Sequence, residues 1–276
     1  MVHVAVNDLG GSSTTARARA CSVTHRATTH PQQLTAFPAM YIGLSVVFFW
    51  VLMSMVWFFK GNSLMAWVYD LVIIRMTKVW YAEVLVLLPG GARVLDVGIG
   101  TATALVHSKE LIKQNNITVV GIDIEKAYVD KAKEVVADAR LAELIKVHCI
   151  SIYEPKLRSL FTGAARFDAA YFSGSLTLMP DPAAALKCAA TMLSDDGLIY
   201  VTQTFQNRSS PLTERVKPLL RKFTSIDFGR VIYKTEVQAI AAKANMKIIR
   251  DVPINGSINN ANQTATLLVL KPGKRL

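Results

Sequence analysis

Residues 93–102 read R-V-L-D-V-G-I-G-T-A, and this stretch decides the fold. Its first half, 93–97, is a short apolar run rich in β-formers that contains one acid, Asp96. The G-I-G at 98–100 predicts a tight turn, and residues 102–114 have the composition and apolar spacing of a helix. A strand, a glycine turn and a helix N-terminus make a cradle for a nucleotide-like ligand. Glycine lets the backbone approach the ligand closely, and the helix N-terminus offers unpaired N–H groups.

Short apolar strands and helices alternate downstream of this stretch. The expected strands are 93–97, 118–122, 145–149, 167–172, 197–202, 246–250 and 264–270, and the expected helices are 102–114, 125–138, 181–193 and 235–244. This alternation predicts an α/β fold with a doubly wound, mostly parallel sheet covered on both faces. The last two strands have no helix between them, so they should pair antiparallel.

Two acids define the ligand better than the glycines do. The dinucleotide fingerprint G-x-G-x-x-G would need glycine at position 103, where Thr103 stands. A carboxylate at Asp96, two residues before Gly98, would repel a pyrophosphate and attract a cationic amino group. Asp123 ends the second strand, where it can accept hydrogen bonds from ribose hydroxyls. The alternative for Asp123 is a local cap on the helix that starts at Glu125.

Four stretches carry a resemblance to a known family. They are D-V-G-I-G-T-A at 96–102, G-I-D-I-E-K-A at 121–127, F-D-A-A-Y-F-S-G-S-L at 167–176 and M-L-S-D-D-G-L-I-Y-V-T at 192–202. Together they resemble the class I S-adenosylmethionine-dependent methyltransferases. The resemblance implies S-adenosyl-L-methionine as cofactor, methyl transfer as the reaction, and a seven-stranded sheet in the order 3-2-1-4-5-7-6 whose seventh strand is antiparallel.

The resemblance also implies which residues hold the cofactor. The first motif would hold the methionine part, with contacts at Asp96, Gly98, Gly100 and Thr101. Asp123 would bind the ribose, and Ile124 would lie against the adenine. Ala102 stands where many members of the family have a third glycine.

Four further expected contacts lie outside these two motifs. Many family members have an acid after the third strand, beside the adenine amino group; this chain departs from that pattern, with Ser151 and Ile152 in its place. Ser173 ends the fourth strand, where the methyl donor would face the acceptor. The stretch Y-D-L-V-I-I-R-M-T-K-V-W-Y at 69–81 is similar to the segment before the first motif in ubiquinone and menaquinone biosynthesis methyltransferases. There the helix closes over the cofactor, which would place Tyr69 near it.

The sequence nominates no general base. The candidates are His148, Tyr153 and Tyr171; His148 and Tyr171 sit inside predicted strands, and each of the three is more often a packed side chain than a base. The five histidines have no metal-ligand spacing, so no metal is expected. Cys149 and Cys188 are expected to be buried free thiols.

The methyltransferase-like domain is expected to span residues 90–276. The segment that precedes it predicts a membrane anchor. Residues 1–38 are rich in Ser, Thr and Ala with one acid, which indicates either a disordered tail or a targeting segment, and Met40 is an alternative start. Residues 40–59 carry no charge and would span about 30 Å as a helix, so 39–60 is predicted as a single transmembrane helix. A buried or interfacial helix is the alternative. Residues 61–89 are expected to form an amphipathic helical lid or linker.

The totals agree with a membrane or an acidic partner. The apolar fraction is 51% and the net charge is +11, and a basic amphipathic insertion runs from 206 to 233. We therefore expect a small-molecule or lipid acceptor at a membrane surface, in the mitochondrion or the endoplasmic reticulum. The alternatives are a protein or RNA methyltransferase, or a non-catalytic membrane scaffold with this fold. RNA is not favoured, because no stacking aromatics interleave with the basic run.

Overall fold

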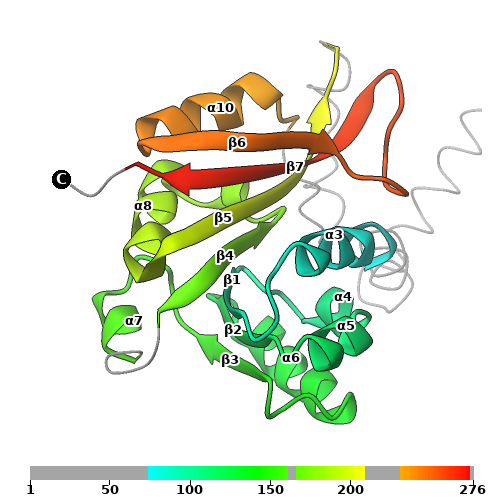
Figure 1. Cartoon of the computed structure of the whole chain (residues 1–276), viewed down its shortest axis with the longest axis vertical. Helices are drawn as coiled ribbons and strands as arrows, with labels where there is room; N and C mark the ends of the chain where they lie inside the picture. The colour runs from blue at the N-terminus through cyan, green and yellow to red at the C-terminus, as the bar shows by residue number, and fades with distance from the viewer. Residues whose placement is uncertain (1–73, 161–165, 209–230, 274–276) are drawn as a thin grey trace, which may run out of the picture. The chain divides into compact units, whose positions relative to one another are not determined.

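The computed structural model describes residues 74–160, 166–208 and 231–273 (Figure 1). Their strands form one sheet in the order β3-β2-β1-β4-β5-β7-β6, as the family resemblance implies. The strands are β1 Arg93–Val97, β2 Thr118–Asp123, β3 Ile145–Cys149, β4 Phe167–Ser173, β5 Leu193–Gln206, β6 Met246–Pro253 and β7 Gln263–Pro272. Strands β1 to β5 pair parallel, and β7 pairs antiparallel with both β5 and β6. The predicted antiparallel pairing of the last two strands is therefore confirmed, with β7 inside the sheet and β6 at its edge.

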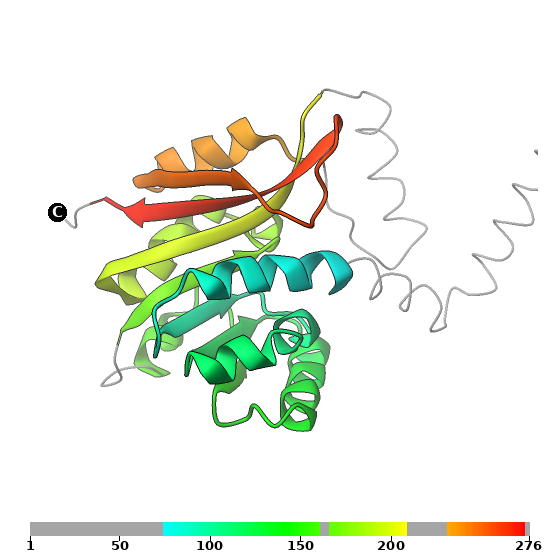
Figure 2. The same cartoon turned by 45° about the vertical axis from the view of Figure 1, so that its right-hand side comes forward.

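Helices cover both faces of the sheet. They are α3 Arg75–Val86, α4 Thr103–Val106, α5 Lys109–Gln114, α6 Lys126–Asp138, α7 Pro155–Leu160, α8 Pro182–Met192 and α10 Lys234–Lys243, with a 3-10 helix η2 at Leu176–Leu178. Helices α3 to α6 pack on one face, and α7, α8 and α10 pack on the other. Figure 2 shows α3 crossing the first face while α10 lies on the opposite side. Two separate apolar cores result, one on each side, as expected for a sheet whose parallel strands are buried on both faces.

The expected helix 102–114 is wrong as a single element. The structure breaks it into α4 and α5, with His107 and Ser108 between them. Both pieces still bury an apolar side chain, Leu105 and Ile112. The apolar spacing that predicted one helix is satisfied by two short helices, because each contributes its own buried residue to the same core.

The fifth strand is longer than predicted. It is expected over 197–202, but β5 starts at Leu193, directly after α8. Its pairing with β4 jumps from Phe167↔Leu193 to Ala169↔Leu198, so residues 194–197 form a bulge inside the strand. At the other end the strand continues to Gln206, because β7 pairs with it through that residue. This extension depends on a strand distant in the sequence.

Several predictions fall outside the described residues or fail within them. Residues 1–38 and 39–60, Tyr69 and most of the basic insertion lie outside the described part of the chain. Helix α3 agrees with a helical segment before β1, and among the described residues no helix is long and apolar enough to span a bilayer. The thiols are free, but Cys149 is exposed and Cys188 half-buried, which corrects the prediction of burial. Cys149 ends β3, which is an edge strand and has one open side.

Candidate active site

The expected cofactor residues gather at one edge of the sheet. Strands β1 to β4 are parallel neighbours, so their carboxyl ends meet there. Asp96, Asp123, Ser151 and Ser173 each lie at or just after one of these ends. In open α/β sheets this edge is where ligands bind, because the connections that leave it diverge and open a crevice. The topology therefore places residues far apart in the sequence at one candidate site.

The turn after β1 requires glycine at its first position. Gly98 has φ +80°, and its N–H donates to the Ile122 carbonyl of β2 at 2.8 Å. A Cβ built on Gly98 would lie 2.6 Å from the Cβ of Ser175, whose hydroxyl donates to the Val97 carbonyl. The loop after β4 thus packs directly on this turn. A side chain here would both strain the backbone and push the two loops apart.

The turn continues to Ala102, whose backbone conformation would suit a third glycine. Ala102 has φ +58°, a left-handed conformation that is unfavourable for residues with a Cβ, and its methyl group is buried. This explains why glycine is common at the position in the family, and why the smallest side chain replaces it here. On either side of Ala102, the hydroxyls of Thr101 and Thr103 form a hydrogen bond of 2.9 Å with each other. Thr101 therefore lies in the turn, and its contact with the cofactor stays a prediction.

Asp123 joins the turn to the second strand. One carboxylate oxygen accepts from the Gly100 N–H at 2.9 Å, and the other accepts from the Glu125 N–H at 3.0 Å. The local hydrogen bond to Glu125 agrees with the capping alternative. The bond to Gly100 goes beyond it, because it fixes the acid against the glycine turn. Each oxygen keeps a further lone pair, so the carboxylate can still accept from a ribose.

An apolar surface follows this acid. Ile124 is 75% exposed, which is unusual for so large an apolar side chain at the end of a buried strand. Exposed apolar area beside the acid expected to bind ribose would suit the face of an adenine ring. Cys149 also lies here, with its thiol 3.7 Å from the Ile124 carbonyl.

The loop after β3 holds Ser151 and Ile152, the two residues expected beside the adenine. Ser151 Oγ accepts from the Tyr153 N–H at 3.3 Å and keeps its own proton available for donation. Ile152 is buried, and it lines a cavity of about 260 Å³ together with Tyr153, Leu157 and Met192. Its side chain therefore packs between the loop and helices α7 and α8. Of the two side chains, only that of Ser151 carries a polar group that could bind the adenine.

Asp96 is a buried acid whose second oxygen has no partner. Tyr81 of α3 donates its hydroxyl to Asp96 Oδ2 at 2.8 Å, and both side chains are buried. Burial raises the pKa of Asp96 from 3.8 to about 7; the charge of Asp123 adds to this rise, while the hydrogen bond from Tyr81 opposes it. Asp96 Oδ1 is buried without a hydrogen-bond partner among the described residues, and so is Ser173 Oγ. Unpaired buried polar atoms at a ligand edge are what a bound amino acid moiety would satisfy.

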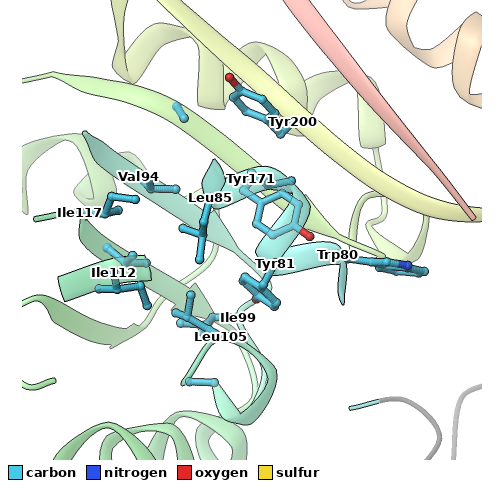
Figure 3. Close-up of a cluster of buried hydrophobic side chains, with 14 of the residues drawn as sticks. Trp80, Tyr81, Leu85, Val94, Ile99, Leu105, Ile112, Ile117, Tyr171 and Tyr200 are labelled. Carbon is cyan, nitrogen blue, oxygen red and sulfur yellow. The ribbon is translucent and has the colours of Figure 1, made fainter. Parts of the chain in front are cut away.

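Tyr81 ends the stretch 69–81 quoted above, but the sequence did not predict its hydrogen bond with Asp96. Tyr81 also packs edge-on against the ring of Tyr171, with centroids 5.0 Å apart (Figure 3). Helix spacing predicts that some residues of α3 face the core, yet it does not say that the core at that point contains an acid. Ser175 was missed for the same reason, since its contact with Gly98 exists only in the folded chain.

The three candidate bases are all engaged elsewhere. Tyr171 is buried, shares a hydrogen bond of 2.9 Å with the Thr202 hydroxyl, and has a pKa raised chiefly by burial. The Tyr153 hydroxyl donates to the Asp181 carbonyl at 2.8 Å. His148 lies within β3, where burial and then the charge of Lys133 lower its pKa. The structure therefore singles out none of the three as a base, and the catalytic base stays unassigned.

The fold and the strand-end site place this chain among α/β proteins that bind a ligand at the carboxyl ends of their strands. A family model described as a methyltransferase domain matches residues 74–249. The chain therefore belongs to the methyltransferase-domain family, and it is an S-adenosylmethionine-dependent methyltransferase.

Solved structures share the fold at low sequence identity. A methyltransferase from Geobacter sulfurreducens, in complex with S-adenosyl-L-homocysteine, is 16% identical, with TM-score 0.50 over 71% of this chain and 90% of that one. Geranyl diphosphate C-methyltransferase from Streptomyces coelicolor A3(2) is 10% identical, with TM-score 0.52 over 71% and 77%. The cyclase SpnF is 16% identical, with TM-score 0.53 over 71% and 80%. No curated protein matches the sequence. Because a cyclase shares the fold, the family match carries the assignment of methyl transfer.

The described residues fit the cofactor. S-adenosylmethionine supplies a methyl group on a positively charged sulfur, so the protein mainly binds and orients. Asp96 and Ser173 have unpaired atoms that would meet the amino acid part, Gly100 leaves open space where it could approach the backbone, and Asp123 would accept from the ribose. The chain's contribution is position and charge. Proton removal is needed only if the acceptor atom carries a proton.

Proposed function

We propose that this enzyme methylates a small apolar molecule or a lipid at a membrane surface, to which a single N-terminal helix anchors it. The observation that carries the proposal is the stretch of twenty uncharged residues at 40–59, N-terminal to the methyltransferase domain. Its length matches the hydrocarbon thickness of a bilayer. An anchor of this kind keeps the active site where apolar acceptors partition, and so raises their local concentration.

Charge supports the same proposal. The chain carries a net charge of +11, and its basic residues include a run in the insertion after β5. Basic side chains near a membrane are attracted to anionic lipid headgroups by about 1 kcal/mol each. The insertion leaves the sheet at Gln206, the carboxyl end of β5, which is the same edge as the cofactor site.

The acceptor class has a parallel among proteins of the same fold. One structural neighbour is a geranyl diphosphate methyltransferase, and another is mitomycin 7-O-methyltransferase; both names describe small-molecule acceptors. Those acceptors belong to those proteins. For this chain they favour a small-molecule acceptor over a nucleic acid. The proposed locations of the membrane-anchored enzyme are the mitochondrion and the endoplasmic reticulum.

The test is a search for products with labelled methyl groups. Cells that express the chain receive methionine with a deuterated methyl group, and the lipid, small-molecule, RNA and protein fractions are compared with cells that express Gly98→Arg. We expect one or more labelled compounds in the lipid or small-molecule fractions that depend on the intact chain. A difference confined to RNA or protein would overturn the proposed acceptor class while leaving the methyltransferase assignment standing.

A further inference from the structure

The contact between helix α3 and the end of β1 is more specific than core packing requires. Tyr81 is 4% exposed and Asp96 is 1% exposed, and a hydrogen bond of 2.8 Å joins them. The Tyr81 ring is held independently, because it packs edge-on against Tyr171 at an interplanar angle of 89°. Tyr171 is in turn fixed by its hydrogen bond with Thr202 of β5. The phenol that meets the acid is therefore immobilised from two sides.

This arrangement treats the two oxygens of Asp96 differently. Oδ2 accepts from Tyr81, while Oδ1 is buried and lacks a hydrogen-bond partner within the described ranges. A carboxylate with one satisfied oxygen can rotate only by breaking that bond, so the orientation of Oδ1 is fixed as well.

We propose that Tyr81 is a positioning residue for the cofactor: its hydroxyl holds Asp96 Oδ2, so that Oδ1 remains oriented and ionised to receive the amino group of S-adenosylmethionine. The proposal rests on S-adenosylmethionine being the cofactor. It assigns to α3 a task in cofactor binding that acts through Asp96. Tyr81 needs no contact with the cofactor itself.

The charges around Asp96 explain why a donor is needed there. The titratable groups that face it are Tyr81 from α3, Tyr171 from β4 and Asp123 from β2. Burial and the charge of Asp123 favour the protonated acid, and the Tyr81 hydroxyl favours the carboxylate. A protonated Asp96 would offer a cationic amino group no charge, and binding would be weak. Removing the hydroxyl should therefore raise the pKa of Asp96 and shift cofactor binding toward higher pH.

The experiment measures S-adenosyl-L-homocysteine binding by calorimetry on the full-length chain in detergent, between about pH 6 and pH 9. Tyr81→Phe removes the hydroxyl and keeps the ring. Tyr200→Phe is the matched control, since Tyr200 is a buried tyrosine in the same core and lies on β5. We expect Tyr81→Phe to weaken binding by about tenfold or more near neutral pH, to regain most of the affinity at high pH, and to melt close to the wild type. Tyr200→Phe should follow the wild-type pH curve.

A double-mutant cycle separates positioning from packing. In an Asp96→Asn background, Tyr81→Phe should have no further effect on affinity, because the charge it supports is gone. A pH curve of Tyr81→Phe that superimposes on the wild type, or a loss of affinity that is equal at every pH, would overturn the proposal. Failure of the wild-type chain to bind at any pH would instead overturn the cofactor assignment.

Discussion

Asp96 and Gly98 are two residues apart and contribute opposite properties to the site. Asp96 brings a buried charge with one unpaired oxygen, and Gly98 brings the absence of a side chain against the loop after β4. Neither is optimal for stability by itself, because an unpaired buried acid is costly and glycine is flexible when unfolded. The loss of stability at Asp96 is understandable if the bound ligand supplies the missing hydrogen-bond partner of Oδ1.

Replacing Gly98 with alanine should disrupt cofactor binding. The added Cβ would lie 2.6 Å from the Ser175 Cβ at a φ of +80°, so the loops must separate. We expect at least a tenfold loss of S-adenosyl-L-homocysteine affinity in calorimetry. Gly256→Ala is the control, because Gly256 also has a positive φ but has only one ordinary contact, 3.8 Å from Val79. Equal losses of affinity in both variants would show that general strain, rather than the cradle, is responsible.

The raised pKa of Asp96 predicts how stability depends on pH. The unfolded acid ionises near 3.8 and the folded acid near 7, so between these values the folded state binds more protons. Stability therefore falls as pH rises through this window, by about 4 kcal/mol in total at 1.36 kcal/mol per unit. Asp96→Asn lacks this contribution, and other carboxyl groups cancel in the comparison.

Thermal unfolding of the ligand-free wild type and Asp96→Asn, followed from about pH 4 to pH 8, checks this sign. The difference in unfolding free energy should move in favour of the asparagine variant as pH rises and then level off above the folded pKa. A difference that is constant with pH would mean that Asp96 titrates at its ordinary value.

At the scale of elements, α3 connects three parts of the domain. Trp80 donates its indole N–H to Ser257 Oγ in the loop between β6 and β7 at 2.9 Å, and Tyr81 reaches the end of β1. A Cβ on Gly174, at the end of β4, would lie 3.5 Å from the Trp80 ring. Trp80 and Tyr81 are adjacent, and Figure 3 shows their side chains diverging from α3. The helix therefore supports the site as well as the core.

Substitutions of Trp80 should separate its packing from its hydrogen bond. Trp80→Ala should destabilise the domain by about 3–5 kcal/mol, because a large buried side chain is lost and a cavity remains. Trp80→Phe keeps most of the apolar contact, so it should cost less. The measurement is the free energy of unfolding by denaturant titration.

Ser257→Ala is the partner substitution. In the wild-type background it should cost about 1 kcal/mol, since the indole N–H loses its acceptor, whereas in Trp80→Phe it should cost almost nothing. A similar cost in both backgrounds would mean that Ser257 stabilises the loop without help from Trp80.

At the scale of the whole molecule, the methyltransferase domain and the segment before it have different requirements. The domain buries two apolar cores on the faces of one sheet, while residues 40–59 have no polar face to turn toward water. The proposed anchor assigns these residues a separate environment. It also explains the mean hydropathy of +0.31, which is high for an α/β enzyme.

Membrane extraction tests the anchor. The full-length chain should stay in the membrane pellet after alkaline carbonate, and a variant that lacks residues 1–60 should move to the supernatant, because about twenty apolar residues hold the first and not the second. Release of the full-length chain by carbonate would contradict the anchor, and the acceptor would then have to be sought among molecules in solution.

Much of the fold could be predicted because it is local. Each predicted strand has a counterpart in the structure, since the apolar runs at 93–97 and 118–122 match strand length and are bounded by turns. The places of Asp96, Gly98 and Asp123 in the candidate site were predicted in the same way, because each lies at or next to the end of a predicted strand. The strand order came from the family resemblance. Helix α7 was missed, because its six residues are too few for a periodic pattern.

What the sequence by itself determined is the set of strands, the glycine turn and the acids at the strand ends, because each depends on residues close together in the chain. Only the tertiary structure decided the length of β5, which pairs with β7, and the partner of Asp96, which comes from α3. The pKa of Asp96 depends on burial and on Asp123 from another strand. Contacts of this kind join segments that are far apart in the sequence at no regular spacing, and so no local sequence pattern predicts them.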